Sequence, residues 1–139
     1  MHNDCFYCTK NEELKDLMIE IKSLEVSTLY LNRDQTHTGR CILAFNQHKK
    51  EIYELTEQER KFFMEDISTS ARALKNAFAP KKINYGIYGD LVSHLHMHIV
   101  PKYENGVNWG EAFVNSPKQK DFINNEAYQE IVSEIKYNL

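Results

Sequence analysis

The chain has 139 residues, 42% of them hydrophobic and 27% charged, which fits a single folded domain over residues 1–139. A formal net charge of −3 argues against a general nucleic-acid binder, because such a protein needs an excess of Lys and Arg to neutralise phosphates. The sequence has no apolar run of the roughly 20 residues that cross a bilayer and does not begin like a signal peptide, so we expect a cytoplasmic protein without a membrane partner.

The first third of the chain predicts a short helix followed by two strands. Thr9 and Glu12 form a capping-box pattern ahead of apolar residues at helical spacing, which are Leu14, Leu17, Met18 and Ile21. Apolar runs then predict strands at residues 24–32 and 41–45, separated by a turn-like segment.

The remainder predicts a long helix, two strands and a last helix. Thr56 and Glu59 form a second capping box at the start of the longest predicted helix, which Pro80 ends. Two strands are predicted next, at residues 83–87 and 92–100. A long loop follows at residues 101–118, and the last helix is predicted around Ala127, Ile131 and Ile135. Neighbouring strands joined by short turns favour an antiparallel sheet with helices on one side, which is an α+β fold.

Three histidines alternate with apolar residues between positions 94 and 98. Side chains of a strand alternate between two faces, so His94, His96 and His98 are expected on one face and Leu95 and Met97 on the other. Three imidazoles in a row can divide the work of binding a metal, attacking an electrophile and donating hydrogen bonds. A row of exposed histidines without function is one alternative, and a site in which all three bind a single metal is the stronger competitor.

Two cysteines near the N-terminus, Cys5 and Cys8, have the spacing of half a zinc site. A redox pair is the alternative, but such a pair is typical of a position between a strand and a helix. If the pair binds zinc, the other ligands must come from histidines far along the chain, and those available are His2, His37, His48 and the three alternating histidines.

These motifs resemble the histidine-triad family, whose signature alternates three histidines with apolar residues. The match is His94-Leu95-His96-Met97-His98-Ile99-Val100, and it extends to the cysteine pair, Asn32, Gly39, His48, the long helix and Pro101-Lys102-Tyr103. Within the family the chain is most similar to the bacterial zinc-containing dinucleoside polyphosphate hydrolases. The resemblance implies an antiparallel sheet of about five strands with two main helices, paired as a homodimer.

The resemblance further implies chemistry at the α-phosphorus of a dinucleoside polyphosphate or a nucleoside phosphoramidate. It makes His96 the nucleophile, through a nucleotidyl-histidine intermediate, and His98 the residue that contacts the phosphate. Asn32 would bind the ribose of a purine nucleotide, and the other residues near the nucleotide would be Asn84, Gly89, Asp90, Leu91, Val92 and Ser93. Asp90 stands where many relatives have glutamine or asparagine, and a carboxylate there repels phosphate unless it turns away or a divalent cation accompanies the substrate.

The metal implied by the resemblance is a structural zinc. Its four ligands would be Cys5, Cys8, His48 and His94, a closed set that leaves no position for water. His37 is the alternative to His48, because the residues before His48 depart from the family pattern.

Two other functions are compatible with these motifs. A metal-dependent hydrolase would bind one metal through all three alternating histidines with an open coordination position, and would leave Cys5 and Cys8 without a role. A nucleotide-binding regulatory module would keep the zinc and the pocket but turn over slowly. The nucleophile His96 argues mildly against that second alternative, because binding alone does not require it.

Overall fold

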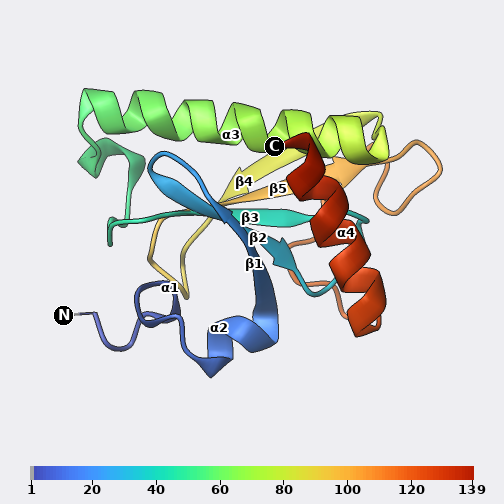
Figure 1. The fold of residues 1–139 in the computed structure, drawn as a ribbon, viewed down its shortest axis with the longest axis horizontal. Coiled ribbons are helices and arrows are strands. Elements are labelled where there is room, and N and C mark those ends of the chain that lie inside the picture. Colours follow the sequence, from blue (N-terminus) through green and yellow to red (C-terminus); the bar gives the residue numbers. More distant parts are fainter. Residues whose placement is uncertain (1) are drawn as a thin grey trace.

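The computed structural model describes residues 2–139 and contains a five-stranded antiparallel sheet of order β1-β2-β3-β5-β4 (Figure 1). The strands are β1 (Met18–Ser23), β2 (Ser27–Asn32), β3 (Cys41–Phe45), β4 (Lys82–Ile87) and β5 (His96–Lys102). The helices are α1 (Phe6–Thr9), α2 (Glu12–Leu17), α3 (Glu57–Phe78) and α4 (Asn125–Asn138), with a 3-10 turn, η1, at Ile52–Glu54. This confirms the predicted α+β fold. Within residues 2–139, no helix has the length and hydropathy to cross a membrane.

The central strands are apolar on both faces, and each face has its own core. Odd-numbered residues such as Leu29, Leu43 and Ile99 pack with side chains of α3 and α4 in the larger cluster. Even-numbered residues such as Tyr30 and Ile42 belong to a smaller cluster with side chains of the N-terminal segment. Figure 1 shows the same division, with α3 on one side of the sheet and α1 and α2 on the other.

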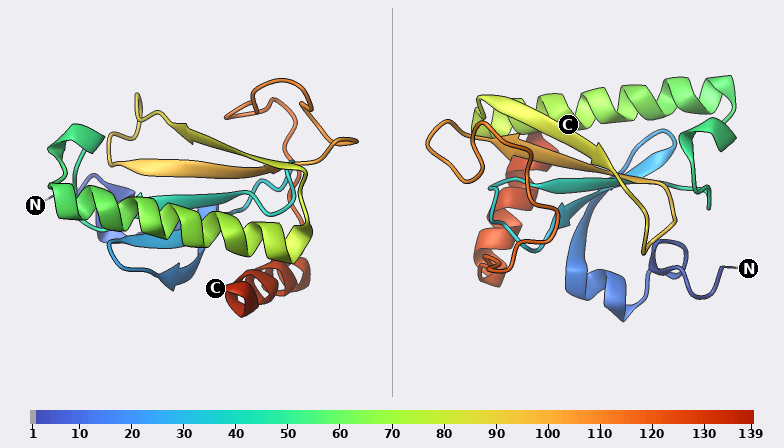
Figure 2. Two further views of the ribbon diagram at one scale, coloured as in Figure 1. Left: turned by 90° about the horizontal axis from the view of Figure 1, so that it is seen from above. Right: turned by 180° about the vertical axis from the view of Figure 1, so that it is seen from behind.

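The alternation of side chains along the strands decides where the histidines lie. In the β3–β5 ladder His96 pairs with Ala44 and His98 pairs with Ile42. Both histidines therefore share the face of the smaller cluster, away from α3 and α4. The loop after β4 and the N-terminal helices gather on this face (Figures 1 and 2), so the histidines lie between the sheet and these two segments.

A capping box located the start of the longest helix, and the spacing of apolar residues located the last one. The Thr56 side chain accepts a hydrogen bond from the Glu59 backbone, the Glu59 side chain accepts one from the Thr56 backbone, and α3 begins there as predicted. The helix ends at Phe78, and Ala79 adopts the left-handed conformation just before Pro80. The last predicted helix is confirmed as α4, with Asn124 as its N-cap.

The predicted helix through Met18 and Ile21 was wrong after Leu17. Asn11, not Thr9, caps α2, and its side chain accepts a hydrogen bond from the backbone of Leu14. Met18 begins β1, which the sequence analysis missed. Met18 belongs to the smaller cluster and Ile21 to the larger one, so the two residues are buried on opposite faces of a covered sheet. In a strand that is buried on both faces, apolar residues three positions apart give the same spacing as one face of a helix, which explains the wrong prediction.

Two predicted strands were too long at their N-terminal ends. The segment predicted at 92–100 becomes regular only at His96, and residues 92–95 form a bent approach to β5. The strand predicted at 24–32 begins at Ser27, because residues 25 and 26 donate their backbone N–H groups to Asp66 on α3 instead of to a neighbouring strand.

Asp66 fastens the β1–β2 turn to α3. Its buried carboxylate accepts hydrogen bonds from Glu25 N at 3.2 Å, Val26 N at 2.9 Å and Ser27 Oγ at 2.6 Å. The carboxylate thus satisfies three donors that would otherwise be left without a partner under the helix.

Replacing Asp66 by alanine is expected to lower the free energy of unfolding by about 3 kcal/mol, because the three donors lose a charged acceptor. Equilibrium urea denaturation measures the change. Glu65→Ala, on the exposed neighbour of Asp66, is the matched control and is expected to stay within about 0.5 kcal/mol of the wild type. A loss below about 1 kcal/mol for Asp66→Ala would contradict this role.

Candidate functional site

A cavity of about 650 Å³ opens on the histidine face of the sheet. His96 and His98 line it from β5, and Asn32 lines it from the end of β2. The loop after β4 closes one side with the predicted residues Gly89, Asp90, Leu91 and Val92. The structure therefore brings together seven of the predicted catalytic and nucleotide-binding residues around a single cavity.

Two predicted nucleotide-binding residues lie elsewhere. Ser93 lines a neighbouring cavity beside Cys5, His48 and His94. Asn84 lies on β4, and its side-chain oxygen accepts a hydrogen bond from Lys102 Nζ at 3.2 Å. The structure thus does not bring Asn84 or Ser93 to the cavity that holds His96.

His96 has one ring nitrogen held by the backbone and one left free. Its Nδ1 donates a hydrogen bond of 2.6 Å to the carbonyl oxygen of His94. Because that carbonyl only accepts, the proton of the neutral ring is on Nδ1, and Nε2 carries a lone pair. Burial lowers the pKa of His96, although the hydrogen bond to His94 opposes the shift, so the ring is neutral at neutral pH.

His98 has the opposite proton arrangement. Arg40 Nη2 lies 3.1 Å from His98 Nδ1, and a guanidinium only donates, so Nδ1 accepts and the proton is on Nε2. Burial, the charge of Arg40 and the nearby His96 lower the pKa of His98 to about 3. His98 is thus a neutral N–H donor on the wall of the cavity.

Sequence reasoning missed two residues of the site, Arg40 and Tyr7. Arg40 precedes β3 and is buried, and no periodic pattern marks a buried arginine. Tyr7 lies between the two cysteines, and its ring centroid is 5.2 Å from that of His94 and 5.1 Å from that of His96. Its position within the cysteine pair was the available signal, because any metal bound by Cys5 and Cys8 fixes the residue between them.

Cys5, Cys8, His48 and His94 converge beside this cavity, with one donor atom from each within 4.8 Å of all the others. The four residues come from the start of the chain, the segment after β3 and the approach to β5. His37 is not part of the group, so of the two predicted fourth ligands the structure gathers His48. No other cluster of three or more such donors occurs in residues 2–139.

The spacing of these donors fits a tetrahedral zinc site. With Zn–N and Zn–S bonds of about 2.0 and 2.3 Å, two bound nitrogens lie about 3.3 Å apart, and a nitrogen and a sulfur about 3.5 Å apart. The two Nδ1 atoms of His48 and His94 are 3.2 Å apart, and His94 Nδ1 is 3.3 Å from Cys5 Sγ and 3.6 Å from Cys8 Sγ.

The proton of His94 also suits a metal ligand. Its Nε2 donates a hydrogen bond of 2.6 Å to the carbonyl oxygen of Phe45, which leaves Nδ1 without a proton and directed at the cysteines. Among the three alternating histidines, the neighbours therefore impose two tautomers: His94 and His98 carry the proton on Nε2, and His96 carries it on Nδ1.

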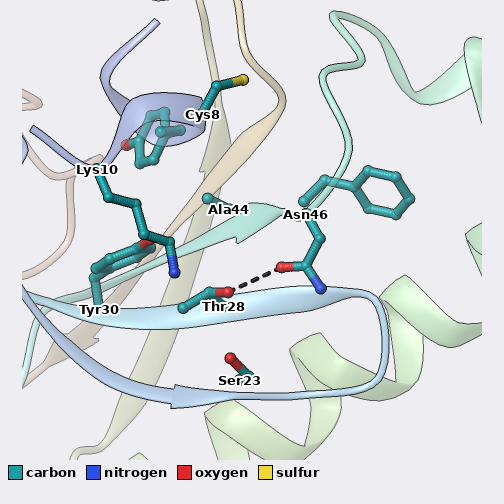
Figure 3. A pocket seen from close by; sticks show the side chains of 9 residues that line it. Cys8, Lys10, Ser23, Thr28, Tyr30, Ala44 and Asn46 are labelled. Atoms are coloured by element: carbon teal, nitrogen blue, oxygen red, sulfur yellow. Dashed lines mark hydrogen bonds between the residues drawn. The ribbon is translucent and has the colours of Figure 1, made fainter.

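A smaller cavity of about 410 Å³ is lined by residues of α1, β2 and β3 (Figure 3). Tyr7 lines both this cavity and the histidine cavity. Among its lining residues, Thr28 Oγ1 donates a hydrogen bond of 2.9 Å to Asn46 Oδ1, and Lys10 Nζ is paired with Glu20 at 2.8 Å. It holds neither His96 nor His98, both of which line the histidine cavity instead.

The family model of the HIT domain matches residues 21–105, which include the end of β1, all of β2 to β5, His48 and all three alternating histidines. The chain belongs to the HIT family. The Bacillus subtilis (strain 168) protein named protein hit is 29% identical over 86 residues, which are 58% of this chain and 59% of that relative. The match thus spans less than two thirds of the relative's length.

Solved HIT structures share the fold over nearly the whole chain. A histidine triad protein of Sinorhizobium meliloti 1021 has a TM-score of 0.84 and 27% identity, and the match covers 93% of this chain and 95% of that one. A zinc-bound histidine triad family protein of Mycobacterium smegmatis shares the fold at a TM-score of 0.68 and 17% identity, with 96% and 91% of the two chains covered. Membership of the HIT family supports a nucleotide-binding or hydrolase-type function.

Asp34, another residue of the cavity wall, ties the loop beside Asn32 to the segment before α4. Its Oδ1 accepts hydrogen bonds from Thr36 N at 3.1 Å, Thr36 Oγ1 at 2.6 Å and Asp121 N at 3.0 Å. Burial acts to raise the pKa of Asp34, but the hydrogen bonds from Thr36 and Asp121, together with Arg40, lower it below the usual value. The ionised carboxylate thus holds the wall together.

Asp34→Asn is expected to lower the free energy of unfolding by about 1–2 kcal/mol at pH 7, through the loss of a charged acceptor. The pKa of Asp34 is lower in the folded chain than in the unfolded chain, where it is about 3.9. The stabilisation that the carboxylate provides is therefore present above about pH 3.9 and is lost as the pH falls through the pKa of the folded chain. Urea denaturation at pH 7 and at pH 3 measures both effects. Asp16→Asn, on an exposed carboxylate, is the control, and an equal difference between Asp34→Asn and wild type at both pH values would overturn the assignment.

Proposed function

We propose that this protein hydrolyses nucleoside phosphates at the α-phosphorus through a covalent nucleotidyl intermediate on His96. The observation that carries the proposal is the hydrogen bond from His96 Nδ1 to the carbonyl of His94, because it leaves Nε2 as a nucleophile in the cavity wall. A neutral ring held in one orientation attacks without prior loss of a proton.

The nucleotide itself is expected along the wall from Asn32 to the loop after β4. Asn32 Nδ2 donates to the carbonyl of Asp34 at 3.1 Å, which directs Oδ1 as an acceptor for a ribose hydroxyl. Apolar side chains that suit a purine base also line the cavity, and they include Phe6, Leu17, Met18, Ile42 and Phe122. We propose dinucleoside polyphosphates or nucleoside phosphoramidates as the substrates, since both offer the same phosphorus.

The reaction has two displacements. His96 Nε2 bonds to the α-phosphorus as the bond to the leaving group breaks, and the cationic ring keeps its Nδ1 proton on the His94 carbonyl. Water then attacks the phosphorus, the electron pair of the P–N bond returns to Nε2, and a proton of the water passes to solvent. His98 Nε2–H donates a hydrogen bond to oxygen atoms that gain charge during these steps.

The geometry speaks against a metal bound by all three alternating histidines. His94 Nδ1 faces the cysteines, whereas the Nδ1 atoms of His96 and His98 are engaged by a carbonyl and by Arg40. A regulatory module with slow turnover would share the geometry described here, and the rate of turnover decides between it and the enzyme.

His96→Ala is expected to abolish AMP release from diadenosine tetraphosphate and from adenosine 5′-phosphoramidate, a loss of at least about 10⁴-fold, since the nucleophile is gone. Chromatography follows AMP. A brief incubation with substrate labelled in the α-phosphate, quenched in alkali, is expected to leave label on wild-type protein only.

His37→Gln is the control for this experiment, because His37 is a buried histidine outside both the cavity and the metal cluster. It is expected to keep both activity and labelling. If a folded His96→Ala protein released AMP at the wild-type rate, the assignment of the nucleophile would fail. No AMP from wild type would favour the regulatory module.

We further propose that Cys5, Cys8, His48 and His94 hold one structural zinc ion. The donor spacing and the proton position on His94 support it, as does the shared fold of the zinc-bound Mycobacterium smegmatis protein. When bound, zinc would supply a cross-link with no open position for water. As one of the four ligands, His94 would be fixed in place, and its carbonyl orients the His96 ring.

Cys8→Ser is expected to reduce zinc from about one ion per chain to less than about 0.2, because one of four ligands is lost. It is also expected to lower the melting temperature. Elemental analysis and thermal unfolding measure the two changes. Cys41→Ala removes a buried thiol outside the cluster and is expected to keep the metal. Equal zinc in Cys8→Ser and wild type would show that the cluster is not the binding site.

A homodimer and a divalent cation accompanying the substrate stay predictions of the family resemblance. Asp90 lines the histidine cavity, so a divalent cation that neutralises its carboxylate would lie beside the substrate and not in the zinc cluster.

For the homodimer, the two strands at the edges of the sheet, which are β1 and β4, are the strands that have a free side.

A further inference from the structure

Arg40 enters the site from the residue immediately before β3. Gly39 precedes it with a φ of +89°, and a Cβ there would lie 2.8 Å from the ring of Phe78, so only glycine fits this bend. The Arg40 side chain is 2% exposed and lines the histidine cavity. A buried guanidinium beside a proposed phosphate site requires an explanation.

The protein satisfies only part of this guanidinium. Nη2 donates to His98 Nδ1 at 3.1 Å and to Asn115 at 3.0 Å through the backbone oxygen and 3.2 Å through the side-chain oxygen. Nε is buried without a hydrogen-bond partner among residues 2–139. No carboxylate of these residues lies within 4.0 Å of the guanidinium. The guanidinium therefore has no direct ion pair, and Asp34 on the same wall acts on its charge only from beyond that distance.

The contact with His98 restricts where its proton can be. An imidazolium would place an N–H against the N–H of Arg40 at 3.1 Å, which is unfavourable for both groups. His98 therefore keeps its single proton on Nε2. The other groups facing His98 are His96 on β5, with ring centroids 5.2 Å apart, Tyr88 after β4 at 5.8 Å, and the apolar ring of Phe113 at 6.2 Å.

We infer that Arg40 is a positioning residue that locks His98 as a neutral Nε2–H donor, and that the site consequently selects substrates whose leaving group departs as a phosphate anion. The inference rests on the proposed nucleotidyl transfer and names its substrate class. A locked neutral imidazole donates a hydrogen bond to an oxyanion but does not deliver a proton. An amine leaving group must receive a proton, whereas a phosphate oxygen need not.

The preferred reaction balances without an acid. His96 Nε2 forms a bond to the α-phosphorus, the bond from that phosphorus to its bridging oxygen breaks, and the electron pair stays on that oxygen. The departing polyphosphate accepts the hydrogen bond from His98 Nε2–H, and the charge of Arg40 behind the ring favours the new anion. No proton changes place in this step.

The first test reads the His98 ring directly. Nitrogen NMR of protein labelled in histidine is expected to show His98 protonated on Nε2 and untitrated from pH 8 to pH 5 in the wild type. In Arg40→Met the ring is expected to titrate nearer the usual value of about 6.5. Arg40→Lys keeps a charged donor and is expected to restore the wild-type spectrum at pH 7.

The second test compares two substrates of the zinc-loaded protein. Wild type is expected to show a kcat/KM for diadenosine tetraphosphate about 100-fold above that for adenosine 5′-phosphoramidate, because it lacks a general acid. In Arg40→Met the value for the tetraphosphate is expected to fall about 100-fold, with the loss mainly in kcat. In Arg40→Met at pH 6, the ratio of kcat/KM for the tetraphosphate to kcat/KM for the phosphoramidate is expected to be at least about tenfold smaller than in the wild type. The reason is that His98 can then take up a proton and deliver it to the amine.

Arg33→Met is the matched control. Arg33 lies over the ring of Tyr128 at 5.3 Å, as Arg40 lies over Phe113 at 5.3 Å, but it does not line the cavity. It is expected to change neither the His98 spectrum nor the substrate ratio. A wild-type His98 protonated on Nδ1 or titrating near pH 6.5, or a wild type that prefers the phosphoramidate, would overturn the inference.

The substrate ratio separates this inference from the proposed function. AMP release with label on His96, but with equal rates on both substrates, would keep the nucleotidyl mechanism and reject the selection by Arg40. If neither substrate released AMP, the proposed function and the selection would both fail. The ring spectra would still show whether Arg40 fixes the His98 proton.

Discussion

The hydrogen bond from His94 Nε2 to the carbonyl of Phe45 is the contact from which the rest of the site follows. It turns His94 Nδ1 to the cysteines, and it holds the residue whose own carbonyl accepts the proton of His96. His94 lies just before β5, so its carbonyl is free of the strand ladder and available to that ring. His94 thus joins the cluster of cysteines and histidines to His96, the proposed nucleophile.

A sheet covered on both faces makes this arrangement stable. The larger core under α3 and α4 supplies most of the buried apolar surface, so the opposite face can carry His96, His98 and Arg40 with partly unmet hydrogen-bonding capacity. Low polarity around these groups strengthens each electrostatic contact. The same surroundings keep both imidazoles neutral, as a nucleophile and a hydrogen-bond donor require.

Residues whose roles follow from local pattern could be predicted from the sequence, whereas those whose roles depend on tertiary contacts could not. Thr56 and Glu59 fixed the start of α3, and the alternation of His96 and His98 fixed their common face. Met18 and Ile21 were misassigned because burial on two faces imitates helical spacing. Arg40 carried no signal, because its partner His98 is 58 residues away and a buried charge has no periodicity.

The metal cluster also has a consequence for the order in which the chain folds. Cys5 and His94 are 89 residues apart, and Cys8 and His48 are 40 apart, so the cluster closes long loops in the chain. Such closures are costly in entropy until β3 and β5 have already brought His48 and His94 together. During synthesis Cys5 and Cys8 are made before His48 and His94, so the two thiols stay without their histidine neighbours until the later strands exist. Because the His94 carbonyl holds the His96 ring, the four-donor cluster and the orientation of His96 are both completed only after β3 and β5 have paired.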